Sequence, residues 1–81
     1  MDNFDSKTHY IAFSLAQSLE QKYKADIMAA KSTMLIYFTN SAGIGEHPQH
    51  LEEMDKQLEI IASAQDKLDA LHRFFPDFVE E

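Results

Sequence analysis

The chain of 81 residues contains no cysteine and only two glycines and two prolines. Without cysteine, no disulfide and no thiolate metal site can stabilise so short a chain. A chain of this length also buries a smaller share of its surface than a typical domain does. We therefore expect a single domain, residues 1–81, that gains stability by binding a partner or a second copy of itself.

Long hydrophobic runs are also absent from the sequence. The longest apolar run is residues 34–38, whereas a helix needs about 20 apolar residues to span a bilayer. The first residues include Asp2 and Asp5, at the place where a signal peptide carries positive charge. These features predict a cytoplasmic protein that does not bind membranes.

Positive charge is scarce in the second half of the chain. Residues 1–40 hold four acids and four lysines, whereas residues 41–81 hold ten acids and only three bases, so the whole net charge of −7 lies in residues 41–81. A surface of this sign repels phosphate backbones, and we expect no nucleic-acid partner. The acids are expected to form a solvated helix face, although they could also meet a basic protein surface.

The few glycines and prolines lie where two helices would end and begin. Gly43 and Gly45 precede Pro48, and Pro76 follows a second stretch without breakers. We expect a helix at about 6–40, a turn at 41–47, a second helix at about 48–75 and a short tail at 76–81. With so short a turn, the helices should form a long antiparallel all-α hairpin.

Apolar residues in both segments recur every three or four positions, which is the spacing of one helix face. In the first segment this apolar stripe is predicted to comprise Ala12, Ala16, Leu19, Tyr23, Ile27, Ala30, Met34 and Tyr37. In the second it is predicted to comprise Leu51, Met54, Leu58, Ile61, Ala64, Leu68, Leu71 and Phe75. Residues 33–39 are rich in β-branched and aromatic residues and could form a short strand, but the stripe runs through them in phase and favours helix.

Many large apolar residues fall outside these stripes. They are Ile11, Phe13, Met28, Leu35, Ile36, Ile60, Phe74 and Phe78. A thin hairpin would expose all of them, and a symmetric dimer that forms a four-helix bundle would cover them. We therefore expect at least a homodimer, with Met28, Leu35 and Ile36 among the interaction residues.

The best metal candidate lies at the start of the second helix, where His47 and His50 are three residues apart and Glu46 and Glu53 flank them. This spacing can place two imidazoles and a carboxylate on one side of a helix, as zinc requires. Polar residues also gather at helix starts without binding metal, so a metal- or small-ligand-binding bundle is the alternative hypothesis.

Carboxylate pairs raise the possibility of a magnesium-dependent nucleotide hydrolase. Glu52 with Asp55, and Asp66 with Asp69, are spaced for such a site, but both pairs lie on one helix and on its polar side. The sequence has no phosphate-binding loop and no nucleophile elbow. We expect no cofactor and no catalytic residue.

Residues 37–48 read Tyr-Phe-Thr-Asn-Ser-Ala-Gly-Ile-Gly-Glu-His-Pro. With Leu-Glu-Glu-Met-Asp-Lys at 51–56 and Asp-Lys-Leu at 66–68, this segment resembles small uncharacterised helical proteins of tailed bacteriophages. The resemblance covers residues 34–71. It implies an accessory protein that acts in the cytoplasm of the host cell, and it assigns no catalytic residue.

The leading hypothesis is a non-enzymatic interaction or assembly protein with an unidentified protein partner. Its turn is a candidate contact surface, because Gly43 and Gly45 enclose the apolar Ile44 although one glycine is enough to stop a helix.

An Ile44→Ser variant tests this surface by thermal unfolding. If Ile44 closes the core, losing about 1–3 kcal/mol should lower Tm by several degrees. If Ile44 is a contact, Tm should barely change while capture of a partner is lost, and an unchanged Tm with unchanged capture would exclude the turn as a contact surface.

Overall fold

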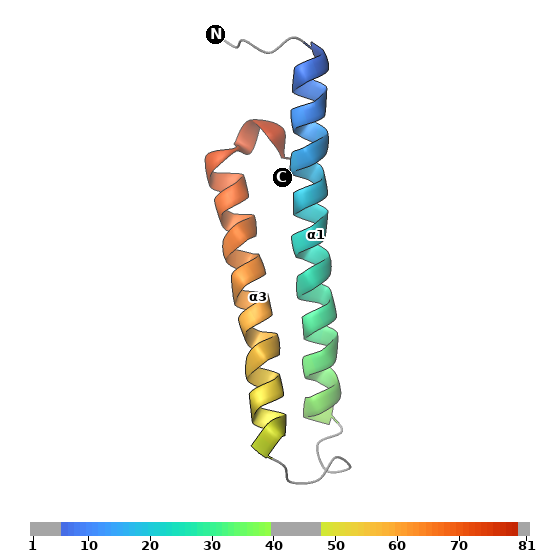
Figure 1. Ribbon diagram of the computed structural model, residues 1–81, viewed down its shortest axis with the longest axis vertical. Coiled ribbons are helices and arrows are strands. Elements are labelled where there is room, and N and C mark those ends of the chain that lie inside the picture. The colour runs from blue at the N-terminus through green and yellow to red at the C-terminus, as the bar shows by residue number, and fades with distance from the viewer. Residues whose placement is uncertain (1–5, 40–47, 80–81) are drawn as a thin grey trace.

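The computed structural model describes residues 6–39 and 48–79 of the chain. Two long helices, α1 (Ser6–Thr39) and α3 (Pro48–Phe74), lie side by side and antiparallel, and a short 3-10 helix, η1 (Pro76–Phe78), follows them (Figure 1). The molecule is a thin rod of 59 × 17 × 16 Å. The predicted all-α hairpin is therefore confirmed.

The helix ends agree with the breakers in the sequence. Pro48 begins α3, and α3 ends at Phe74, two residues before Pro76. Residues 33–39 belong to α1, so the helical interpretation of this segment is correct and the strand alternative is wrong. A lone strand would leave its backbone groups unpaired, whereas the helix satisfies them internally.

The two helices meet along one seam with the heptad spacing of a coiled coil. Its α1 members are Phe13, Ala16, Glu20, Tyr23, Ile27, Ala30, Met34 and Tyr37, all buried or half-buried. Its α3 members are His50, Met54, Gln57, Ile61, Ala64, Leu68 and Leu71, also buried or half-buried. The best-buried positions include three alanines, at 16, 30 and 64. Small side chains at these positions allow the helix axes to approach closely.

Four leucine and phenylalanine positions of the predicted stripes lie outside this seam. Leu19, Leu51, Leu58 and Phe75 are 41–73% exposed. Glu20, Gln57 and His50 take seam positions instead, and Phe13, predicted to lie off the stripe, is half-buried. The predicted stripes and the seam both step by three or four residues, so spacing allows either set, and a partner on the other helix, such as His72 for Glu20, decides between them.

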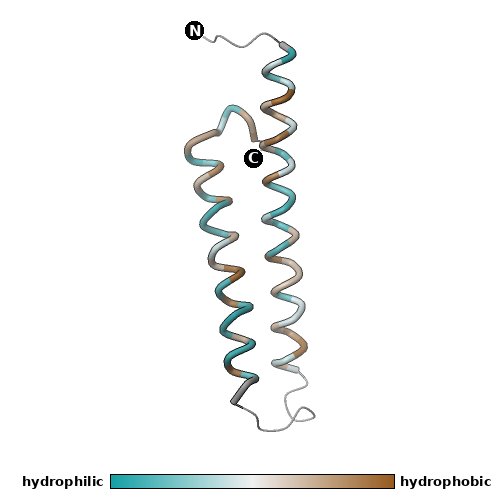
Figure 2. The backbone as a smooth tube through the Cα atoms, in the orientation of Figure 1, coloured by the Kyte–Doolittle hydropathy of each residue, from teal (hydrophilic) through white to brown (hydrophobic). Residues whose placement is uncertain are grey.

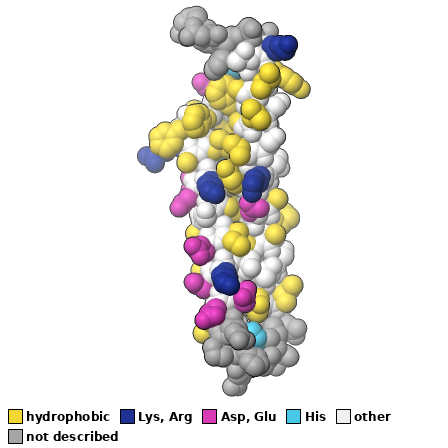
Figure 3. All heavy atoms as spheres, viewed as in Figure 1, with side chains coloured by type: hydrophobic (Ala, Val, Ile, Leu, Met, Phe, Trp, Pro, Cys, Tyr) yellow, Lys and Arg dark blue, Asp and Glu magenta, His cyan; other side chains and the backbone are white. Residues whose placement is uncertain are grey.

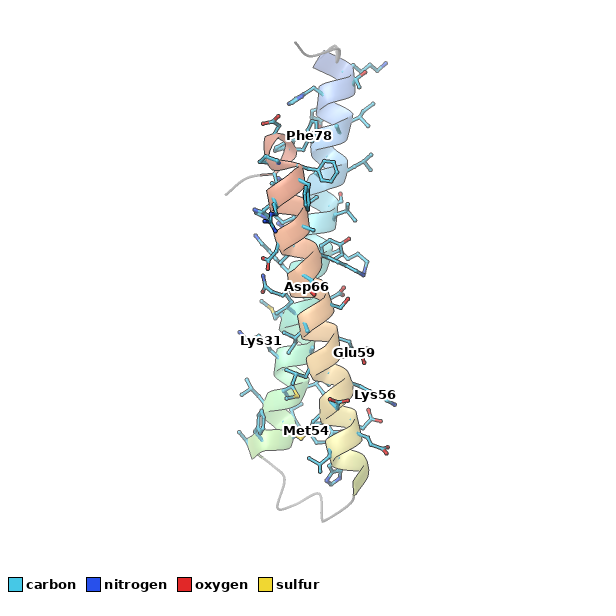
Figure 4. The ribbon with its side chains drawn as sticks, turned by 90° about the vertical axis from the view of Figure 1, so that its left-hand side faces the viewer. Lys31, Met54, Lys56, Glu59, Asp66 and Phe78 are labelled. Atoms are coloured by element: carbon cyan, nitrogen blue, oxygen red, sulfur yellow. The ribbon has the colours of Figure 1, made fainter. Side chains whose placement is uncertain are left out.

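Residues 76–79 belong to the segment that the sequence predicted as a short tail, and they pack back onto the hairpin. After α3 the backbone turns through hydrogen bonds from Phe75 N to Leu71 O (3.0 Å) and from Phe78 N to Phe75 O (3.2 Å). Val79 is buried against Ala16 and Leu71. Phe78 packs on the same cluster, with its ring centroid 5.5 Å from that of His9 (Figure 4). This turn therefore closes the hairpin at the end opposite the connection between α1 and α3.

The close approach at the alanines can be tested by enlarging one of them. Ala64→Leu should destabilise the protein by about 1–3 kcal/mol, because the seam has no room for extra carbons. Ala62 is exposed on the same helix, so Ala62→Leu is the matched control and should change stability by less than about 0.5 kcal/mol. Thermal unfolding measures both, and equal Tm values for the two variants would contradict a tightly packed seam.

Candidate functional site

The predicted interaction residues Met28, Leu35 and Ile36 are 70%, 58% and 59% exposed. They lie on the side of α1 that faces away from α3. We call this side the back face of α1, and every residue in it is exposed. Its members are Ile11, Ser14, Leu15, Ser18, Gln21, Lys22, Ala25, Met28, Ala29, Ser32, Leu35, Ile36 and Thr39.

Lys7 lies on the same side nearer the start of α1, and between Ile11 and Thr39 the back face carries a single charged side chain, Lys22. Its Nζ is 3.1 Å from Asp26 Oδ2 on the same helix, so even this charge is paired within the helix. The outer side of α3 is different and carries Glu52, Asp55, Glu59, Asp66, Asp69 and Arg73, all exposed. Figure 2 accordingly colours α3 as mostly hydrophilic, while α1 has hydrophobic positions along its length. A helix of a two-helix protein normally presents charge to water along its outer side. The outer side of α3 does so, whereas the exposed Lys24 and Lys31 of α1 lie beside its back face.

Hydroxyl groups on or beside the back face bond to the backbone of α1 itself. Ser18 Oγ donates to Ser14 O at 2.9 Å, Thr33 Oγ1 to Ala29 O at 3.1 Å, and Thr39 Oγ1 to Leu35 O at 2.7 Å. This back-bonding satisfies the hydroxyl donor and leaves carbon atoms as much of the outer surface. The face is therefore less polar than its serine and threonine content suggests.

The exposed apolar surface continues around α1 into a groove between the helices. This groove of about 590 Å³ is lined by Leu19, Tyr23, Lys67, Ala70, Leu71, Phe74 and Phe75. Phe74 is 68% exposed, and Leu15 on the adjoining back face is 63% exposed. In Figure 3 hydrophobic side chains gather over the upper half of the molecule, on both helices, while most acidic ones follow α3 below them. Sequence reasoning missed this groove, because it assigned Leu19 and Phe75 to the core.

A second candidate is the buried carboxylate of Glu20, whose side chain is only 3% exposed. His72 Nε2 on α3 donates to Glu20 Oε2 at 2.8 Å, and Lys24 Nζ lies 3.5 Å from the same oxygen. Gln17, one turn earlier, has a buried Nε2 with no hydrogen-bond partner among the described residues. The hydrogen bond joins the two helices at one position, so a shift of one helix along the other would leave Glu20 buried without His72.

The predicted metal cluster is only partly described. Glu46 and His47 lie outside the described residues, as do Gly43, Ile44 and Gly45 of the turn. The His50 ring lies 5.8 Å from that of Tyr37, and Glu53 Oε2 is 3.5 Å from Lys56 Nζ. Across residues 6–39 and 48–79, no three histidine, aspartate or glutamate side chains are grouped so that they could hold a metal ion.

The carboxylate pairs of the hydrolase hypothesis lie on the solvent side of α3. Glu52, Asp55, Asp66 and Asp69 are all exposed. On α1, Glu20 is engaged by His72 and Asp26 by Lys22. Asp26 of α1 and Glu59 of α3 line one groove of about 470 Å³, but Lys56 and Lys67 line it with them, and the described residues group no three carboxylate or histidine side chains that could hold a metal ion.

Comparison with known proteins yields no relative: no protein-family model, no curated protein and no solved structure matches the chain. Neither of the two described helices has a stretch long and apolar enough to cross a bilayer.

The contact between Glu20 and His72 predicts a non-additive pair of mutations. His72→Leu alone should cost about 1.5–3 kcal/mol, because it leaves the Glu20 carboxylate buried without its donor. The double variant Glu20→Leu with His72→Leu should regain most of this loss, since two apolar groups then replace the pair.

Denaturant unfolding at one protein concentration measures these changes. Lys24→Ala is the control, because the Lys24 side chain is 55% exposed and should contribute less than about 1 kcal/mol. A double variant whose loss equals the sum of the two single losses would show that Glu20 and His72 are not coupled.

Proposed function

We propose that the protein is a non-enzymatic interaction or assembly protein, and that it associates with itself through the back face of α1. The observation that carries this proposal is the exposure of Leu15, Met28, Leu35 and Ile36 on a face with one charged residue. Exposed apolar surface of this extent on one side of a small protein is typical of a protein–protein contact.

The exposed area of the chain supports the same proposal. The chain exposes 6375 Å² of surface. A compact protein of 9.3 kDa exposes about 5000 Å², so the hairpin exposes about 1400 Å² more than that. A specific interface buries about 800 Å² on each partner. The surplus is therefore large enough for the hairpin to pair with a second copy in a four-helix bundle.

The charges of the helices indicate which side stays in water. The described α1 has four lysines against Glu20 and Asp26, a net charge of +2, and α3 has six acids against three bases, a net charge of −3. The acidic outer side of α3 is costly to bury and repels nucleic acid. The proposal therefore places α1 inside the assembly and α3 on its surface.

The resemblance of residues 34–71 to accessory proteins of tailed bacteriophages fits a role of this kind. An accessory protein that holds other proteins in place needs a contact surface and no catalytic group. The unidentified protein partner would then bind to what the self-associated hairpin leaves exposed. Residues 43–45, which lie outside the described residues, stay a candidate contact on the sequence alone.

Light scattering coupled to size-exclusion chromatography tests the proposal. At micromolar concentration the protein should have at least twice the 9.3 kDa mass of one chain. Leu35→Glu should shift the protein toward monomer, because it places a charge within an apolar contact. Ala62→Glu adds the same charge to the outer side of α3 and should leave the mass unchanged. A stable 9.3 kDa monomer for the unmodified protein would contradict the proposal.

A further inference from the structure

We infer that the back face of α1 pairs with the same face of a second copy in an antiparallel arrangement, with the twofold axis at Ala25. This inference rests on the proposed function, because it names the partner and the geometry of the proposed contact. Three features of the face carry it: the distribution of small and large side chains, the position of its one charge, and the exposed groove at its end.

Small side chains occupy the centre line of the back face near its middle, and large apolar ones lie at both ends. Ser18, Ala25 and Ser32 follow one another at intervals of seven residues along the centre line of the face. Ile11 and Leu15 lie at one end and Leu35 and Ile36 at the other. Two helices can approach closely where their facing residues are small, so the centre of the contact belongs near Ala25.

An antiparallel pairing about Ala25 brings small residues together near the centre and sets a small residue against a large one farther out. In this register Ser18 faces Ser32 of the second copy, and Gln21 faces its Met28. Ser14 faces Leu35 of the second copy in the same way. Alternation of large and small side chains across facing positions fills an interface without voids.

The position of Lys22 favours the antiparallel orientation over the parallel one. A parallel pair in register would place Lys22 at the same height as Lys22 of the second copy with no acidic residue of the back face near either, and like charges at an interface are unfavourable. In the antiparallel register Lys22 faces Ala29 of the second copy and comes within reach of its Asp26. Because Lys22 and Asp26 are already 3.1 Å apart within one helix, the two pairs would form a group of alternating charge. Antiparallel helix dipoles are favourable as well.

The same register accounts for the exposed groove beside Leu15. It places Ile36 of the second copy against Leu15, next to the groove in which Leu19 and Phe74 are exposed. The apolar end of one copy near residue 36 therefore meets the apolar groove of the other, and the twofold axis repeats this contact at the opposite end.

Disulfide trapping tests this geometry, because the chain has no cysteine of its own. Nitrogen-15-labelled Ser18→Cys protein is mixed with unlabelled Ser32→Cys protein, refolded together, oxidised mildly and analysed by intact mass. In the antiparallel register residue 18 faces residue 32, whereas two copies of residue 18 lie about 21 Å apart along the helix axes. A disulfide requires Cα atoms about 4.4–6.8 Å apart. The mixed dimer should therefore exceed either cross-linked homodimer at least about fivefold.

Ala62→Cys, on the exposed side of α3, is the control and should remain largely uncross-linked. Homodimers of Ser18→Cys in excess over the mixed dimer would indicate a parallel pair and overturn the inference. A sample that light scattering shows to be dimeric, but that forms no disulfide through residues 18 and 32, would also overturn it while leaving the proposed function intact. A monomer by light scattering would overturn both.

Discussion

Two helices that pack side by side can bury only one face of each, and the rest of this structure depends on that constraint. The seam is narrow: it holds one row of side chains from each helix, and three of its best-buried positions are alanines, so Leu15, Met28, Leu35 and Ile36 have no place in it. Those side chains lie outside the seam, and they are concentrated on α1 because α3 devotes its outer side to acidic residues. The hairpin is therefore one layer with an apolar back face, which a single chain cannot cover.

The helices themselves could be predicted because breakers mark their ends. Gly43, Gly45, Pro48 and Pro76 divide the chain into the segments that form α1 and α3. The choice between Leu19 and Glu20 as a seam residue could not be predicted from hydrophobicity, because it depends on His72, which lies 52 positions away along the chain and donates to Glu20. The burial of Val79 depends in the same way on a turn after α3 that only the folded chain forms.

The candidate site was predictable in part. Met28, Leu35 and Ile36 fall off the helical stripe in the sequence, and all three are exposed. The back face of α1 as a whole also has a signal in the sequence, because this side of the helix carries almost no charge. A search for apolar periodicity alone does not detect it. The groove near Phe74 could not be predicted, since it forms only where the end of α3 lies beside Leu19 on α1.

The central claim is that a second copy covers the back face of α1, so that folding and association occur together. The most direct test is the dependence of Tm on protein concentration. If two chains unfold and separate in one step, each tenfold dilution should lower Tm by about 4 °C, given the unfolding entropy of two chains of this size. A Tm that stays constant over a hundredfold dilution would show that the single hairpin is stable alone, and it would contradict the account.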